Sequence, residues 1–130
     1  VFRTDYSYST YLLSHWVRDR GIMSLEEAIR KLTFVPASLF GLFDRGLVRP
    51  GMAADLMVFN PETIGPLEPG EAQDLPGGAT RRKQLAQGIE WTVVNGQVLL
   101  EKGEHTGVYP GKVARNLSRP QAMTVSQSTA

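Results

Sequence analysis

The sequence predicts an α+β fold, with helices in the first third of the chain and strands after it. Residues 8–43 repeat apolar side chains at helical spacing, whereas residues 56–59 and 89–101 are short runs rich in apolar, β-branched and aromatic side chains. The pattern changes within the segment 44–61, which contains the turn pair Pro50-Gly51. We therefore expect helices before this segment and a small sheet after it.

Composition divides the chain into three parts. We expect a helical part at 1–43, a sheet part at 44–115 and a disordered tail at 116–130, where Ser, Gln, Thr and Pro replace the apolar period. Val1 stands where an initiator Met is expected, so we also expect the chain to be a fragment.

The overall composition is that of an ordinary globular domain, with 130 residues, 42% hydrophobic and 21% charged. A net charge of +1 gives no electrostatic argument for nucleic acid or a membrane surface as a partner. The chain has no cysteine, which excludes disulfides and thiolate chemistry. It has neither an apolar run of membrane-spanning length nor a signal peptide, so we expect a cytoplasmic protein.

The first predicted helix covers residues 8–20. Tyr8, Leu12 and Trp16 recur every four residues on one face. Ser9 or Thr10 is expected to cap its start, and the Gly after Arg20 to end it, because glycine readily adopts the left-handed backbone that follows a helix.

Two further helices are predicted before residue 43. Ser24-Leu25-Glu26-Glu27 has the pattern of a capping box, in which the Ser hydroxyl and a Glu carboxylate satisfy free amides at a helix start. Val35 precedes a proline and should leave the helical region, so the third helix is expected to begin at Pro36 and run through Phe40, with Gly41 ending it.

The later half should contain three paired strands. Leu56 to Phe59 is short and apolar, as in a buried strand, and residues 60–80 read as a long connection without regular structure. The runs 89–94 and 97–101 flank Asn95-Gly96, which favours a type I′ hairpin turn. An isolated hairpin is marginally stable, so we expect it to pair with residues 56–59.

The candidate site residues are few, and each has a plain structural interpretation. His15 and Asp19 are four residues apart on a predicted helix, a pair that could bind a metal or move a proton but is also common on solvated helix surfaces. His105 lies in a predicted turn, where a lone histidine is usually not a ligand. Asp55 directly precedes the apolar strand, and we expect Arg45 or Arg49 to pair with it as a structural anchor.

Other patterns exclude several classes of site. Arg81-Arg82-Lys83 is the only basic run, too short and without aromatic neighbours for a nucleic-acid surface. The sequence contains no phosphate-binding glycine loop and no Gly-x-Ser-x-Gly nucleophile motif. We therefore predict no catalytic, cofactor-binding or metal-binding residue in this chain.

One stretch of the junction resembles a segment near the C-terminus of metal-dependent amidohydrolases: Pro50-Gly51-Met52-Ala53-Ala54-Asp55-Leu56-Met57-Val58-Phe59-Asn60-Pro61. Further stretches in the same order narrow the resemblance to the N-acyl-D-amino-acid deacylases, or D-aminoacylases: Ser9 to Arg20, Pro36 to Leu42, Gly88 to Gly96, Gly103 to Gly107 and Pro110-Gly111. The resemblance covers residues 5–115.

This resemblance implies a (β/α)₈ barrel that holds zinc at the ends of its strands, and a β-sandwich assembled from both ends of a longer chain. Residues 1–43 would be the last helical part of the barrel, and residues 44–115 the returning part of the sandwich. The zinc ligands and the general base would lie upstream of Val1, and Asp5 would match a later loop aspartate with no catalytic role. We therefore expect a zinc-dependent hydrolase of the amide bond in N-acyl-D-amino acids, inactive as this chain alone.

Two other functions are also compatible with the sequence. The first is a non-catalytic α+β module for binding or oligomerisation. The second is an amidohydrolase that acts on a cyclic amide. Without a barrel, the helices would expose apolar side chains, so we expect self-association of the isolated chain: Leu12, Trp16, Leu25, Ile29 and Leu32.

Overall fold

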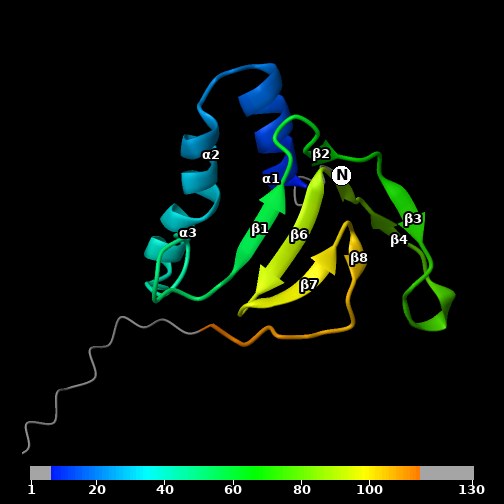
Figure 1. Cartoon of the computed structure of the whole chain (residues 1–130). Coiled ribbons are helices and arrows are strands. Elements are labelled where there is room, and N and C mark those ends of the chain that lie inside the picture. Colours follow the sequence, from blue (N-terminus) through cyan, green and yellow to red (C-terminus); the bar gives the residue numbers. More distant parts are fainter. Residues whose placement is uncertain (1–6, 115–130) are drawn as a thin grey trace, which may run out of the picture.

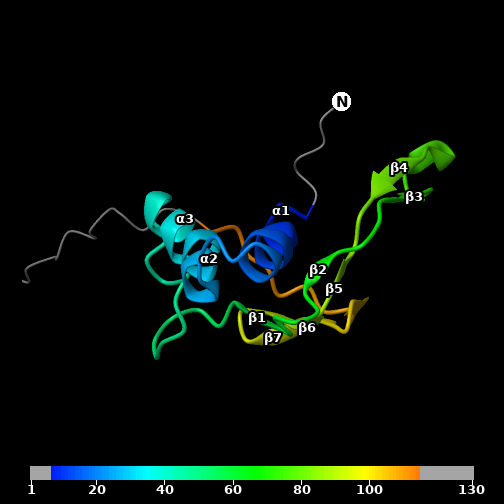
Figure 2. The same cartoon turned by 90° about the horizontal axis from the view of Figure 1, so that it is seen from above.

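A computed structural model of the chain describes residues 7–114. The helices form one layer, and this layer lies over one side of the main sheet (Figures 1 and 2). The predictions for Asp5 and for the tail at 116–130 lie outside the described residues. Within them, no helix has both the length and the apolar character needed to cross a membrane.

The first helix combines two helical types. The α-helix α1 (Tyr8–Tyr11) continues into the π-helix η1 (Leu12–Asp19), in which Arg20 N donates to His15 O, five residues back, at 2.9 Å. The expected cap at Ser9 or Thr10 was wrong, because the helix starts after Ser7 and Thr10 is buried within it. The predicted end was confirmed by Gly21, which has φ +58°.

Helix α2 (Leu25–Leu32) begins as predicted. Ser24 Oγ accepts a hydrogen bond from Glu27 N at 3.2 Å, which is the serine half of the capping box. The Glu27 carboxylate pairs with Lys31 Nζ one turn later, at 3.2 Å. Ala28, the residue after Glu27, is fully buried in the core.

Helix α3 (Phe34–Leu39) starts two residues before the predicted start at Pro36. The expectation that Val35 leaves the helical region was therefore wrong. Pro36 lies in the first turn of α3, where backbone amides have no acceptor within the helix, so its missing N–H costs no hydrogen bond. Gly41, with φ +68°, follows the helix end as expected.

The predicted three-stranded pairing was confirmed and extended by one short strand. β1 (Leu56–Phe59), β6 (Ile89–Val94), β7 (Gln97–Glu101) and β8 (Glu104–His105) form an antiparallel sheet in the order β1-β6-β7-β8. Asn95 and Gly96 have φ of 47° and 76°, the two positive angles that the type I′ turn requires.

The segment 60–80 is more regular than predicted. β2 (Gly65–Pro66) pairs with β5 (Ala86–Gln87), and β3 (Gly70–Ala72) pairs with β4 (Arg81–Lys83), while a 3₁₀ turn covers Pro76–Gly78. The β3–β4 ribbon projects away from the main sheet (Figures 1 and 2). The Pro and Gly residues suggested an irregular connection, but these short ladders depend on backbone pairing with residues about 10 to 20 positions later.

The core is small. Leu13, Ala28 and Ile64 form its fully buried centre, where helix layer and sheet meet. Four of the five apolar side chains that were expected to be exposed pack against this centre and are partly buried: Leu12, Leu25, Ile29 and Leu32. Trp16 is 39% exposed.

Strand β1 differs from its prediction as a buried strand. Leu56, Met57 and Val58 are 38%, 42% and 46% exposed. Among residues 7–114, helices cover only one face of the sheet, and β1 lies at its edge. The apolar run at residues 56–59 therefore forms a strand, as predicted, but the side chains of this strand are not buried as predicted.

Candidate functional site

The junction before β1 is held by a charged network. Asp55 Oδ1 accepts a hydrogen bond from Asn95 N at 2.8 Å, and Asp55 Oδ2 accepts one from Arg45 Nη1. Arg45 Nε and Nη2 donate to the two carboxylate oxygens of Asp44, each at 3.0 Å. The network joins the loop before β1 to the hairpin turn, so the predicted role of Asp55 as an anchor was confirmed, with Arg45 as its partner.

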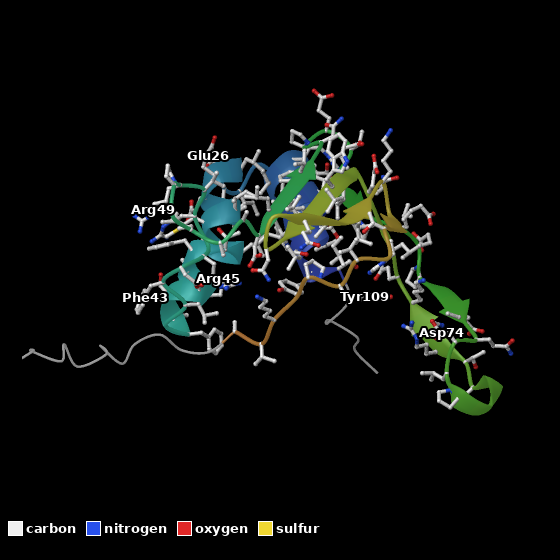
Figure 3. All side chains as sticks on the ribbon, turned by 60° about the horizontal axis from the view of Figure 1, so that its bottom comes forward. Glu26, Phe43, Arg45, Arg49, Asp74 and Tyr109 are labelled. Carbon is white, nitrogen blue, oxygen red and sulfur yellow. The ribbon has the colours of Figure 1, made fainter. Side chains whose placement is uncertain are left out.

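Two carboxyl groups have lowered pKa values because arginine binds them. Hydrogen bonds from Arg45 hold the pKa of Asp44 below its usual value. Arg81 Nε and Nη2 each donate to Asp74 at 2.6 Å, and these bonds lower the pKa of Asp74. Asp74 lies on the projecting ribbon, away from Arg45 and the junction (Figure 3), and Arg81 is the first residue of β4 in that ribbon.

The Asp74 pair predicts a measurable pH effect. A lowered folded-state pKa means that the pair stabilises the ribbon above the ordinary carboxyl pKa of 3.8, and that this stabilisation is lost as the pH falls through the lower folded value. We expect Arg81→Gln to raise the pKa of Asp74 toward 3.8, measured by NMR titration of the side-chain carboxyl carbon.

Lys83→Gln is the matched control, because Lys83 acts on Asp74 through its charge alone and is the weakest of the causes. Its effect on the pKa of Asp74 should be smaller than that of Arg81→Gln. An equal effect of the two substitutions would show that the hydrogen bonds do not set this pKa.

The structure places His15 and Asp19 in different contacts. The His15 ring stacks on Tyr11, with centroids 4.8 Å apart, and meets the edge of Trp16 at the same distance. The Asp19 carboxylate pairs with Arg18 Nε at 3.1 Å. The predicted helix-surface interpretation therefore fits this pair better than a metal or acid–base site.

His105 is also held by local contacts. Its Nδ1 accepts a hydrogen bond from Gly107 N at 2.9 Å, and its ring lies against Tyr109 at 4.7 Å between centroids. Within residues 7–114, no three His, Asp or Glu side chains gather closely enough to hold a metal ion. The donor groups of the described residues therefore do not fit a zinc site.

A cavity of about 700 Å³ beside β1 was not predicted from the sequence. It lies between α2, the start of α3, the loop 46–48 and the strand, so its walls come from segments far apart in the sequence. Most of its lining is apolar: Leu25, Ile29, Phe34, Leu47, Val48, Leu56, Met57 and Phe59, with Glu26, Arg30, Thr33, Gly46 and Asp55. No local sequence pattern indicates it, because its walls come together only in the folded chain.

Comparisons with known proteins agree on one family. A family model described as "Amidohydrolase family" matches residues 2–100. The chain is 34% identical over 102 residues to a D-aminoacylase of Alcaligenes xylosoxydans xylosoxydans, covering 78% of this chain and 19% of the relative. It is 37% identical over 105 residues to an N-acyl-D-aspartate deacylase of the same organism, covering 80% of this chain and 19% of the relative.

The chain is also similar to a more distant relative and to solved structures. A dihydroorotase of Pelotomaculum thermopropionicum is 28% identical over 82 residues, which are 62% of this chain and 19% of the relative. A crystal structure of D-aminoacylase superimposes with a TM-score of 0.67 at 34% identity, covering 85% of this chain and 21% of that chain. Another D-aminoacylase structure comes from work on its binuclear metal centre. The chain spans about a fifth of the length of these relatives.

Proposed function

Because this chain belongs to the amidohydrolase family, we propose that it forms part of the scaffold of an N-acyl-D-amino-acid deacylase and supplies none of its chemistry. The substrate class is supported by the 34–37% identity to D-aminoacylase and N-acyl-D-aspartate deacylase over about four fifths of the chain. The observation that carries the second half of the proposal is the distribution of donors, because among residues 7–114 neither histidine lies in a group that could hold a metal.

The helical part at 1–43 is proposed as the last helical portion of a barrel, and residues 44–115 as the returning portion of a β-sandwich. The single helix layer over a sheet with an open edge at β1 supports this division. Zinc, if it is the metal of the whole enzyme, is then held by residues outside the described part of this chain, and Arg45 and Asp55 keep the junction in place.

The direct test of this proposal is a pair of chimaeras. In one, the chain replaces the aligned segment of the Alcaligenes D-aminoacylase, and in the other it replaces the aligned segment of the Pelotomaculum dihydroorotase. We expect the first to hydrolyse an N-acetyl-D-amino acid within about tenfold of the unmodified enzyme. We expect the second to lose at least a hundredfold in dihydroorotate turnover. Each enzyme with the segment deleted is the negative control.

An active dihydroorotase chimaera together with an inactive D-aminoacylase chimaera would favour the second candidate function, an amidohydrolase of cyclic amides. The observation in its favour is the similarity to several dihydroorotases, which reaches 28% identity. Failure of both chimaeras, with both proteins folded, would favour a non-catalytic module. The isolated chain is also proposed to self-associate through its exposed apolar side chains. Light scattering measures its molar mass, and the mass of a single chain at high concentration would contradict this proposal.

A further inference from the structure

The turn between β6 and β7 contains a chemically reactive pair of residues. In an Asn-Gly pair, the backbone nitrogen of the glycine attacks the side-chain amide carbon of the asparagine more easily than in other pairs, because glycine has no Cβ to hinder the approach. Asn95 and Gly96 are both exposed at the tip of the hairpin. Water therefore reaches the two groups that would react.

Both reacting groups donate hydrogen bonds to other segments of the chain. Gly96 N donates to Ala54 O at 3.0 Å, and Asn95 Nδ2 donates to Pro110 O at 2.7 Å. A third bond, 2.8 Å long, runs from Asn95 N to Asp55 Oδ1. Ala54 and Asp55 lead into β1, whereas Pro110 belongs to the chain after β8, which runs back past the end of the hairpin (Figure 1). Two segments distant in sequence thus hold the turn.

These hydrogen bonds oppose the reaction between the two groups. Gly96 N must lose its proton before it attacks, and a hydrogen bond donated to a carbonyl stabilises the protonated form. The side chain of Asn95 must turn its amide carbon toward Gly96 N, but the bond to Pro110 O holds this side chain toward the chain after β8. The reaction therefore requires that the turn first be released from its neighbours.

We propose that Asn95 is a site of spontaneous deamidation, which the folded chain keeps closed and which opens when the junction before β1 or the chain after β8 leaves the turn. Gly96 N then bonds to Asn95 Cγ and the Cγ–Nδ2 bond breaks. The proton of Gly96 N passes through water to Nδ2, which leaves as ammonia. Water opens the resulting succinimide ring at Cγ to give an aspartate, or at the main-chain carbonyl carbon to give an isoaspartate. Water is the only co-reactant.

The product does not fit the closed turn. A carboxylate at position 95 has no N–H to donate to Pro110 O, so two acceptor oxygens would face each other. It also adds a negative charge beside Asp55, which binds the backbone of the same residue. Release of the turn is reversible, but deamidation is not. Each modified chain therefore keeps a permanent record that its turn was released, whatever reaction the whole protein performs.

The first test follows the modification of Asn95 in the 130-residue chain at mildly alkaline pH, by peptide mass spectrometry with detection of isoaspartate. We expect the folded chain to react at least tenfold more slowly than the same chain unfolded in guanidinium chloride. Equal rates in the folded and unfolded chain would overturn the proposal, and this comparison requires no variant.

Two variants locate the closure. Asp55→Ala removes one of the bonds that hold the turn and should raise the rate of deamidation at least threefold in chains that circular dichroism shows to be folded. Asp74→Ala removes another arginine-bound carboxylate, on the projecting ribbon, and should leave the rate unchanged. Equal rates in these two folded variants would also overturn the proposal.

A second pair of variants tests whether the product opens the turn. Asn95→Asp reproduces the aspartate product, and Gln97→Glu makes the same change from amide to carboxylate at another exposed side chain of the hairpin. We expect Asn95→Asp to speed amide exchange at Gly96 at least tenfold by NMR, and Gln97→Glu to leave this exchange unchanged. Equal exchange in the two variants would show that the contacts of Asn95 do not close the turn and would overturn the proposal.

Discussion

Replacing Gly88 with alanine is expected to cost about 3–5 kcal/mol of unfolding free energy, enough to unfold a domain with a core of this size. Gly88 has φ +78°, and an added Cβ would lie 2.5 Å from Ile64 N and 2.6 Å from Ile64 Cα. Ile64 has little room to move away, because it is 1% exposed and its carbonyl accepts a 2.7 Å hydrogen bond from Arg18 Nη1.

Gly103→Ala is the matched control for Gly88→Ala. Gly103 also has a positive φ, +87°, but an added Cβ would meet no atom within 4 Å. It should therefore cost only the backbone strain of a left-handed alanine, about 1–2 kcal/mol. Urea denaturation of both variants measures the difference, and equal losses would show that the contact with Ile64 does not constrain this site.

Replacing Asp55 with alanine is expected to cost about 1–3 kcal/mol, the second largest effect. The substitution leaves Asn95 N without its acceptor in the hairpin turn and removes one of the two carboxylates bound by Arg45. The side chain of Asp55 is 29% exposed, so solvent screens this interaction in part. Unfolding in urea gives the total loss, and amide exchange at Asn95 should accelerate before the rest of the sheet opens.

Asp19→Ala is the control for Asp55→Ala. Asp19 also pairs with an arginine, but its side chain is 53% exposed and its partner is the adjacent Arg18. Exposed pairs of this kind contribute about 0–1 kcal/mol. If the two aspartate variants lost the same stability, the network between the junction and the hairpin turn would not be an anchor.

The features predicted correctly from the sequence are those set by neighbouring residues. The start of α2 follows from Ser24 and Glu27, three residues apart, and the hairpin follows from the two positive φ angles of Asn95 and Gly96. The pairing of Asp55 with an arginine was also predicted, with Arg45 and Arg49 as the candidates, and Arg45 is the partner in the structure.

The features that were missed depend on residues distant in the sequence. The short ladders of β2 with β5 and of β3 with β4 join positions on either side of the 3₁₀ turn. The π-helix at Leu12–Asp19 is an exception, because nothing in the structure or the local sequence explains it. The cavity beside β1 combines residues of α2 with the loop 46–48, which are distant in the sequence. An apolar run predicts a strand, but it does not state which faces of that strand are covered.

Hydrolysis of an N-acetyl-D-amino acid by the purified chain alone, with zinc added, tests most directly whether these residues supply scaffold or chemistry. We predict no turnover above the rate without protein, because His15 and His105 are engaged in ring stacking and a turn hydrogen bond and no donor cluster exists within residues 7–114. Zinc-dependent turnover that co-purifies with the chain and disappears with a chelator would contradict this assignment.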